Sequence, residues 1–152
     1  MFVIESSIQP ESNLEARAVV DVDRHVKLVY ASGHGRMPGS AFVLTWGDRV
    51  IPFDASANEV RDAVSGDTYF RTTIQMFGAS PSAENAVGAR PFAFADEEER
   101  AAAYRLAVEA LLVFGSSYDG LSKPDGYNRV LEGGREWRLS DFGIKGAAGE
   151  IA

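Results

Sequence analysis

The segment 32–40 is the part of the sequence whose residue types come closest to a site for chemistry. It reads Ser-Gly-His-Gly-Arg-Met-Pro-Gly-Ser, so three glycines surround His34 and Arg36. Glycine lets a backbone approach a ligand closely, and a histidine with an arginine can hold an anionic group. The loop from Gly33 to Gly39 is therefore a candidate site for a small anionic ligand or for an enzyme substrate.

The same loop has two other interpretations, as a plain connection between strands or as a protein-contact surface. A phosphate-cradling loop contains Gly-Lys-Ser/Thr and leads into a helix, whereas this loop has no such lysine and leads into a strand. Arginine and methionine at a loop tip suit a protein interface. The partner-binding candidates are this loop tip and the densest acidic run of the chain, namely His34, Arg36, Met37, Asp96, Glu97 and Glu98.

The rest of the sequence offers no catalytic, metal-binding or cofactor-binding pattern. It has no cysteine, which excludes disulfides, thiolate metal sites and cysteine nucleophiles. The other histidine, His25, begins an expected strand, and two histidines nine residues apart form a weak metal pair. Asp119-Gly120 and Asp125-Gly126 are better explained as turns than as calcium ligands. We therefore expect a non-catalytic protein with no cofactor and no metal.

Composition indicates one soluble domain with an acidic balance. The 152 residues are 45% hydrophobic and carry a net charge of −7, with the excess of acids greatest in residues 51–100. A negative field disfavours direct binding to nucleic acid and to anionic membranes, and it favours basic partners. No apolar run is long enough to span a bilayer, and the first residues lack the features of a signal peptide. We expect a protein of the bacterial cytosol or of a phage-infected host.

Apolar alternation predicts strands through most of the first half of the chain. The Gly47-Asp48 pair predicts a tight hairpin turn between two of them, because glycine accepts positive φ without steric cost. Pro52 lacks an N–H group, so we expect its strand to lie at an edge of the sheet. The expected strands are residues 2–4, 16–21, 25–30, 41–46, 49–53 and 69–77, with a short helical turn at 11–15.

Capping residues predict two helices. Ser56 with Glu59 forms a capping-box pattern for a short helix that ends at Gly66. The run 96–99 places acids in the first turn of a longer helix that ends at Gly115. Helical spacing on the longer helix turns Tyr104, Val108, Leu111 and Leu112 toward the core and Glu97, Glu98, Arg105 and Glu109 toward water.

The last expected element is a hairpin of residues 128–132 and 135–139 around Gly133-Gly134, and a long polar loop spans 78–90. Six or seven strands joined mainly by hairpins predict an α+β fold. Its mainly antiparallel sheet carries one long and one short helix packed on one face. We expect one globular domain over residues 1–142, followed by a flexible glycine-rich tail at 143–152.

These features favour a non-catalytic binding protein. In size, acidity and lack of cysteine or catalytic motifs, the chain resembles immunity proteins that neutralise toxins and phage-encoded inhibitors of host systems. This resemblance implies docking on another protein, and the acidic balance implies a basic partner such as a nucleic-acid-handling protein. Two alternatives remain: a small-ligand binder or enzyme that uses the loop from Gly33 to Gly39, and a structural subunit of a phage or other assembly that pairs through edge strands.

Overall fold

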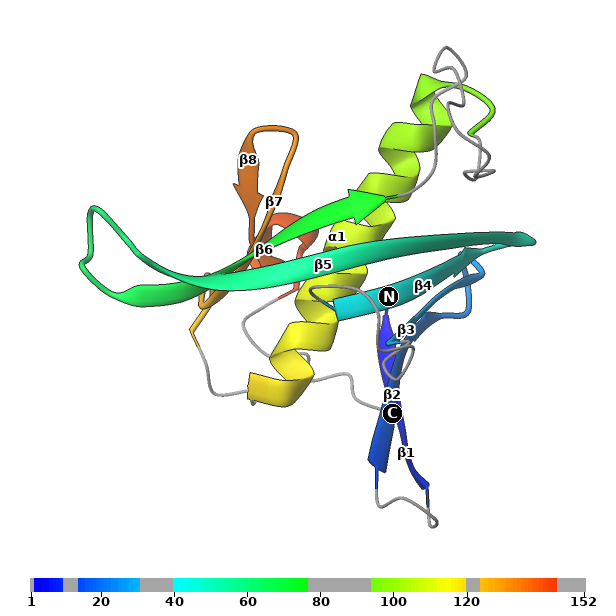
Figure 1. Ribbon diagram of the computed structural model, residues 1–152, viewed down its shortest axis with the longest axis horizontal. Coiled ribbons are helices and arrows are strands. Elements are labelled where there is room, and N and C mark those ends of the chain that lie inside the picture. The colour runs from blue at the N-terminus through cyan, green and yellow to red at the C-terminus, as the bar shows by residue number, and fades with distance from the viewer. Residues whose placement is uncertain (1, 10–13, 31–39, 77–93, 120–123, 145–152) are drawn as a thin grey trace.

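An eight-stranded sheet curves around one long helix in this chain (Figure 1). The computed structural model describes residues 2–9, 14–30, 40–76, 94–119 and 124–144. In chain order the elements are β1 (Val3–Gln9), β2 (Leu14–Asp21), β3 (Val26–Tyr30), β4 (Ser40–Trp46), β5 (Arg49–Arg61), β6 (Thr68–Met76), α1 (Glu97–Asp119), β7 (Asn128–Glu132), β8 (Arg135–Trp137) and the 3₁₀ helix η1 (Leu139–Phe142).

Strand order in the sheet follows the sequence from β1 to β8. Strands β1 to β6 form an antiparallel meander, and β7 then returns parallel to β6, with Phe70 opposite Asn128. A parallel return needs a long crossover, which α1 provides. The α+β class is thus confirmed, whereas the sheet is mixed and has eight strands instead of six or seven.

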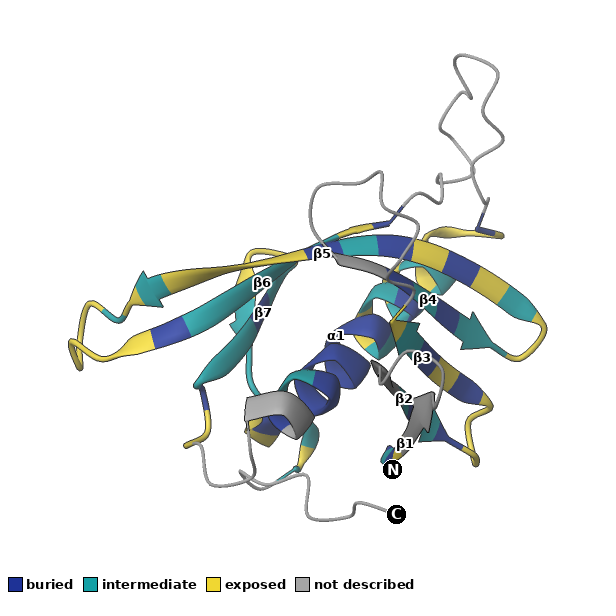
Figure 2. Ribbon diagram, turned by 60° about the horizontal axis from the view of Figure 1, so that its bottom comes forward, coloured by how far each residue is buried: buried dark blue, intermediate teal, exposed yellow. Residues whose placement is uncertain are grey.

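The core lies between α1 and the inner face of the sheet (Figure 2). Alternation along each strand turns every second side chain inward, and the strand register aligns these side chains in rows. One buried row runs through Ile4, Val19, Leu28, Leu44 and Ile51. Val108 and Leu112 on α1 are fully buried in the same core. Burial of these apolar surfaces is the main force that holds the helix on the sheet.

Helix α1 begins where the capping residues predict. The Oδ1 of Asp96 accepts the Glu99 N–H at 2.8 Å, and the Oε1 of Glu99 accepts the Ala95 N–H at 2.8 Å. Of the residues predicted to face the core, Val108, Leu111 and Leu112 are buried and Tyr104 is half-buried. The prediction that side chains face water is correct for Glu97, Glu98 and Arg105. It is wrong for Glu109, which is buried.

The predicted end of the helix at Gly115 is wrong, because α1 continues to Asp119. Gly115 lies against the start of β7, where a Cβ atom would come within 3.5 Å of the Asn128 side chain. This spacing is that of an ordinary van der Waals contact, so the packing does not require glycine at this position. Tertiary packing of α1 offsets the low helix propensity of Gly115.

The short helix predicted over 56–66 is wrong, since β5 runs on to Arg61. Its pairing with β6 is continuous from Phe53 opposite Met76 to Arg61 opposite Thr68. The turn follows at Asp62, whose Oδ1 accepts the Val64 and Ser65 N–H groups at 2.8 and 3.0 Å. This long hairpin projects past the rest of the sheet, at the left of Figure 1.

Two other local predictions also need correction. Within the segment 11–15, Leu14 and Glu15 belong to β2 and not to a helical turn. Strand β5 lies between β4 and β6, so Pro52 is not on an edge strand. However, β6 pairs with β5 only from Phe53 onward, and Pro52 therefore lies just beyond that ladder.

The last hairpin is confirmed, with Gly133 and Gly134 at φ values of 62° and 78° in its turn. Its second strand is shorter than the predicted 135–139, because β8 ends at Trp137 and Leu139 begins η1. At the far end of η1 the Ile144 N–H still donates to Leu139 O at 3.2 Å. The remainder of the predicted tail, residues 145–152, lies outside the described residues, as does the predicted loop 78–90. None of the helices in the described ranges is long and apolar enough to cross a membrane.

Candidate functional site

The predicted partner-binding residues fall into two groups in the structure. His34, Arg36 and Met37 lie outside the described residues, together with the whole loop from Gly33 to Gly39. Asp96, Glu97 and Glu98 form the start of α1 and are exposed. Asp96 caps the helix, whereas the carboxylates of Glu97 and Glu98 form no ion pair with any described residue.

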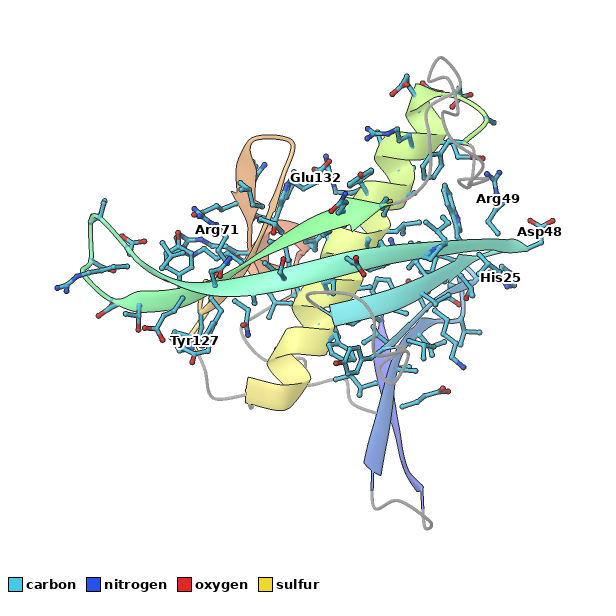
Figure 3. The ribbon with its side chains drawn as sticks, in the orientation of Figure 1. His25, Asp48, Arg49, Arg71, Tyr127 and Glu132 are labelled. Atoms are coloured by element: carbon cyan, nitrogen blue, oxygen red, sulfur yellow. The ribbon has the colours of Figure 1, made fainter. Side chains whose placement is uncertain are left out.

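Two contacts bring the start of α1 together with turns from the sheet. Arg49 Nη1 pairs with Glu99 Oε2 at 3.0 Å, which links the helix to the β4–β5 turn. The Gly47 N–H donates to His25 O at 2.8 Å, which links that turn to the β2–β3 turn. Figure 3 shows His25, Asp48 and Arg49 gathered at this end of the sheet. Five exposed carboxylates, which we call the acidic end, lie on these three segments: Asp23, Asp48, Asp96, Glu97 and Glu98.

His25 belongs to the β2–β3 turn and not to a strand. It is exposed and has a φ of 55°, a left-handed conformation that is uncommon for residues other than glycine. Within the part of the chain that the structure describes, no three His, Asp or Glu side chains are grouped so that they could hold a metal ion.

The face of the sheet opposite α1 carries a set of apolar side chains on β1 to β5. Two cross-strand rows contain them, one from Val3 through Val20 to Val50 and one from Ala18 to Pro52. Val50, at 57%, and Pro52 are exposed, and the other five are half-buried. We call this set the valine face: Val3, Ala18, Val20, Val29, Val43, Val50 and Pro52.

The valine face adjoins the acidic end, because Val50 follows Asp48 by two residues at the start of β5. Val22, in the β2–β3 turn beside Asp23, is 72% exposed. Lys27 and Thr45 are the polar residues within the rows. β-branched side chains have few rotamers, so they lose little conformational entropy when a partner covers them.

A buried ion-pair cluster supports this end of the sheet. Asp21 is fully buried, and its Oδ2 accepts a hydrogen bond from Arg24 Nε at 2.6 Å. Arg24 Nη2 reaches across to Glu109 Oε2 on α1 at 3.0 Å, which explains why Glu109 faces inward. Burial raises the pKa of Asp21, but hydrogen bonds, including those from the side chain and backbone of Arg24, lower it to about 2.

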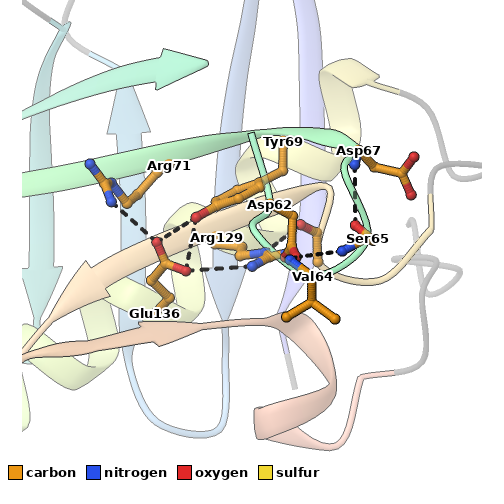
Figure 4. A network of polar contacts seen from close by, with 9 residues as sticks. Asp62, Val64, Ser65, Asp67, Tyr69, Arg71, Arg129 and Glu136 are labelled. Carbon is orange, nitrogen blue, oxygen red and sulfur yellow. Dashed lines mark hydrogen bonds and ion pairs between the residues drawn. The ribbon is translucent and has the colours of Figure 1, made fainter. Parts of the chain in front are cut away.

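A second polar cluster lies at the other end of β5 (Figure 4). The Arg129 guanidinium stacks on the Tyr69 ring at 3.6 Å and pairs with Asp62 at 3.0 Å and Glu136 at 3.4 Å. Arg71 also pairs with Glu136, at 3.4 Å. These contacts join the β5–β6 turn to β7 and β8. They explain the charged side chains of this cluster as residues that stabilise the fold.

The pKa shifts in this cluster follow from the same contacts. Backbone hydrogen bonds from Ser65 and Val64, and then the Arg129 side chain, lower the pKa of Asp62 to about 2. Burial raises the pKa of Tyr69, and its hydrogen bond to Glu136 raises it further. Burial opposes ionisation of Glu136, yet hydrogen bonds from Tyr69 and Arg71 and the Arg129 charge lower its pKa. The lowered pKa values keep Asp62 and Glu136 ionised for their ion pairs, and the raised pKa of Tyr69 keeps its hydroxyl protonated as a donor to Glu136.

Asp125 and Gly126 form a turn, as the sequence predicts. The Oδ1 of Asp125 accepts the Ser140 N–H at 3.2 Å, and its Oδ2 accepts the Ser140 hydroxyl at 2.6 Å. Both residues line an open pocket of about 500 Å³ between the β5–β6 turn and the start of β7. Sequence reasoning missed this pocket, because its walls come from segments about 60 residues apart.

Comparison of the chain with protein-family models, with curated proteins and with solved structures finds no significant match.

Proposed function

We propose that this chain is a non-catalytic protein that binds a basic protein through the acidic end and the adjoining valine face. The observation that carries the proposal is the contact between these two surfaces at Val50, where exposed apolar residues meet carboxylates without ion pairs. A patch with an apolar centre and a polar rim is the usual form of a protein interface.

The acidic end supplies the charge complementarity in this proposal. Arg24 and Arg49, on the two turns of this end, each already pair with a carboxylate, and Arg100 near the start of α1 stacks on Tyr104. The excess negative charge of the acidic end therefore remains available to steer a basic partner toward it.

The valine face supplies the buried contact area. Its side chains point away from α1, so they contribute no burial to the core, and β-branched residues there fit a flat, tightly packed contact. Specific interfaces bury about 800 Å² on each partner. The apolar rows form the centre of such an area, and the surrounding turns with Val22 and Asp48 form part of its rim.

The partner class that fits this surface is a protein whose own ligand is acidic. Proteins that handle nucleic acids carry basic stripes that bind phosphates. Docking of the acidic end on such a stripe would cover it and inhibit nucleic-acid binding, which is the mode of action that we propose for this chain.

The proposal is tested by affinity capture from a lysate of the source organism with matched baits. A Val50→Glu bait should lose a basic protein that the wild-type bait retains at low salt, because a charged group cannot be buried unpaired at the interface. Val64→Glu is the control, since Val64 is 98% exposed at the far tip of the β5–β6 hairpin. Quantitative mass spectrometry measures each retained protein.

Two outcomes of this capture would contradict the proposal. One is that no protein distinguishes the wild-type bait from the Val50→Glu bait. The other is that Val64→Glu removes the same protein to the same extent. The thermal midpoint of both variants should match that of the wild type, because both valines are exposed.

A further inference from the structure

The pocket of about 500 Å³ at the far end of β5 has the size of a small-molecule site. The β5–β6 turn forms one wall, with Asp67. The segment before β7 forms the other, with Tyr127, and Arg138 closes it from beyond β8. It lies at the opposite end of β5 from Val50, so it is separate from the protein-binding surface proposed above.

Arg138 is the residue in this pocket that most resembles a ligand-binding group. Its guanidinium lies flat against Gly126, where a Cβ atom would come within 3.2 Å of Nη1. Gly126 has a φ of 85°, a conformation suited to glycine. A side chain at residue 126 would therefore crowd the guanidinium, and the glycine leaves room for Arg138, which is half-buried.

Most other arginines in the described part of the chain have a clear partner. Arg24, Arg49, Arg71, Arg129 and Arg135 form ion pairs, and Arg100 and Arg105 stack on aromatic rings. Arg138 is half-buried, yet its guanidinium has neither a carboxylate nor a ring among the described residues. The N–H groups of this guanidinium are therefore available to donate to a carboxylate that enters the pocket.

The other groups of the pocket narrow the class of ligand. Asp62, Asp67 and Asp125 also line it, so their charge opposes a phosphate dianion. Asp62 and Asp125 are occupied by Arg129 and Ser140, whereas the side chain of Asp67 is exposed and makes no hydrogen bond or ion pair with a described residue. A molecule with one carboxylate and one ammonium group complements the charges of Arg138 and Asp67, which both line the pocket.

From this arrangement we infer that the pocket binds a free amino acid, with Arg138 on its carboxylate and Asp67 on its ammonium group. The planar guanidinium of an arginine can donate two parallel hydrogen bonds to one carboxylate. Tyr127 in the lining is half-buried and offers aromatic surface for the side chain of the ligand.

The test is a titration of the full chain with the common L-amino acids, followed by two-dimensional amide NMR. At least one amino acid should shift the Gly126 and Tyr127 amide resonances, with a Kd on the order of 1 mM because the pocket is open to water. Its N-acetyl derivative and its amide derivative, which lack one charge each, should both bind more weakly. Inorganic phosphate should leave these resonances unchanged.

Two variants assign the site. Arg138→Ala should raise the Kd at least tenfold, whereas Arg61→Ala should leave it unchanged, since Arg61 is an exposed arginine without an ion pair that lies outside the lining. Unchanged amide spectra elsewhere establish that each variant is folded. The inference is wrong if no amino acid shifts the pocket resonances, if phosphate shifts them instead, or if Arg138→Ala binds as the wild type does.

Discussion

Replacement of Leu112 by alanine should lower the free energy of unfolding by about 2–5 kcal/mol. Leu112 is fully buried in the core between α1 and the inner face of the sheet. The change removes apolar burial and leaves a cavity that the neighbouring strands fill only in part. Urea denaturation of both proteins, with the slope m checked for equality, measures the loss.

Leu106→Ala is the matched control on the same helix. Leu106 packs against the core but remains partly exposed, so its truncation should cost less than that of Leu112. An equal or smaller loss at Leu112 would contradict the packing of α1 on the sheet as described here.

Replacement of Asp21 by alanine should have the second-largest effect, about 3 kcal/mol at neutral pH. The change removes the acceptor for the Asp23 and Arg24 N–H groups and leaves Arg24 with Glu109 alone. Arg24 is partly exposed, so water compensates for some of the lost pairing and keeps the cost below that of a fully buried pair. The measurement is again the urea midpoint, with Asp23→Ala, an exposed neighbour, as the control.

The same carboxylate predicts a pH dependence. The pKa of Asp21 is about 2 in the folded chain and 3.8 as an unperturbed carboxyl group. The unfolded chain therefore binds the proton first, so the stabilisation is complete above about pH 4 and is lost as the pH falls toward 2. The wild type should lose about 2 kcal/mol more than Asp21→Ala over this window. Equal losses would contradict the pairing.

Two hairpin turns and the start of α1 were predictable, because their determinants lie within a few residues. The Gly47-Asp48 and Gly133-Gly134 turns form where predicted, with positive φ at Gly47 and at both glycines of the second turn. The start of α1 at Asp96 depends on a capping residue and an acid three positions later. Asp96 caps the Glu99 N–H as the pattern implies, whereas Glu99 reaches back to the N–H of Ala95, one residue before the cap.

The same kind of local pattern gave a wrong prediction at residues 56–66, where a short helix was expected. Ser56 and Glu59 have capping-box spacing, but the segment pairs with β6 as far as Arg61, and strand pairing prevailed over the local preference. Glu109 was misplaced for a related reason. Its partner Arg24 lies 85 residues away, and no periodicity along α1 reveals a guanidinium that arrives from the β2–β3 turn.

The candidate site was predictable only in part. The acidic run at the start of α1 was visible in the sequence, and the structure adds Asp23 and Asp48 from two turns that the sequence could not place beside it. Alternation within single strands was also visible at Val26 and Leu28. The valine face depends on the register of five strands, which no local signal specifies.

The role of the acidic end in binding is tested most directly by the association rate of this chain with its captured partner, measured by stopped-flow fluorescence at rising salt. The wild-type rate should fall steeply between about 10 mM and 150 mM salt, as the Debye length shrinks from ~30 Å to ~8 Å. Glu98→Lys should slow association at low salt and change stability by only a few tenths of a kcal/mol. Glu59→Lys makes the same change in net charge at an exposed position on β5 outside the acidic end, and it should slow association less. Equal rates for Glu98→Lys and the wild type at low salt would show that the acidic run only begins a helix, and would contradict binding of a basic partner there.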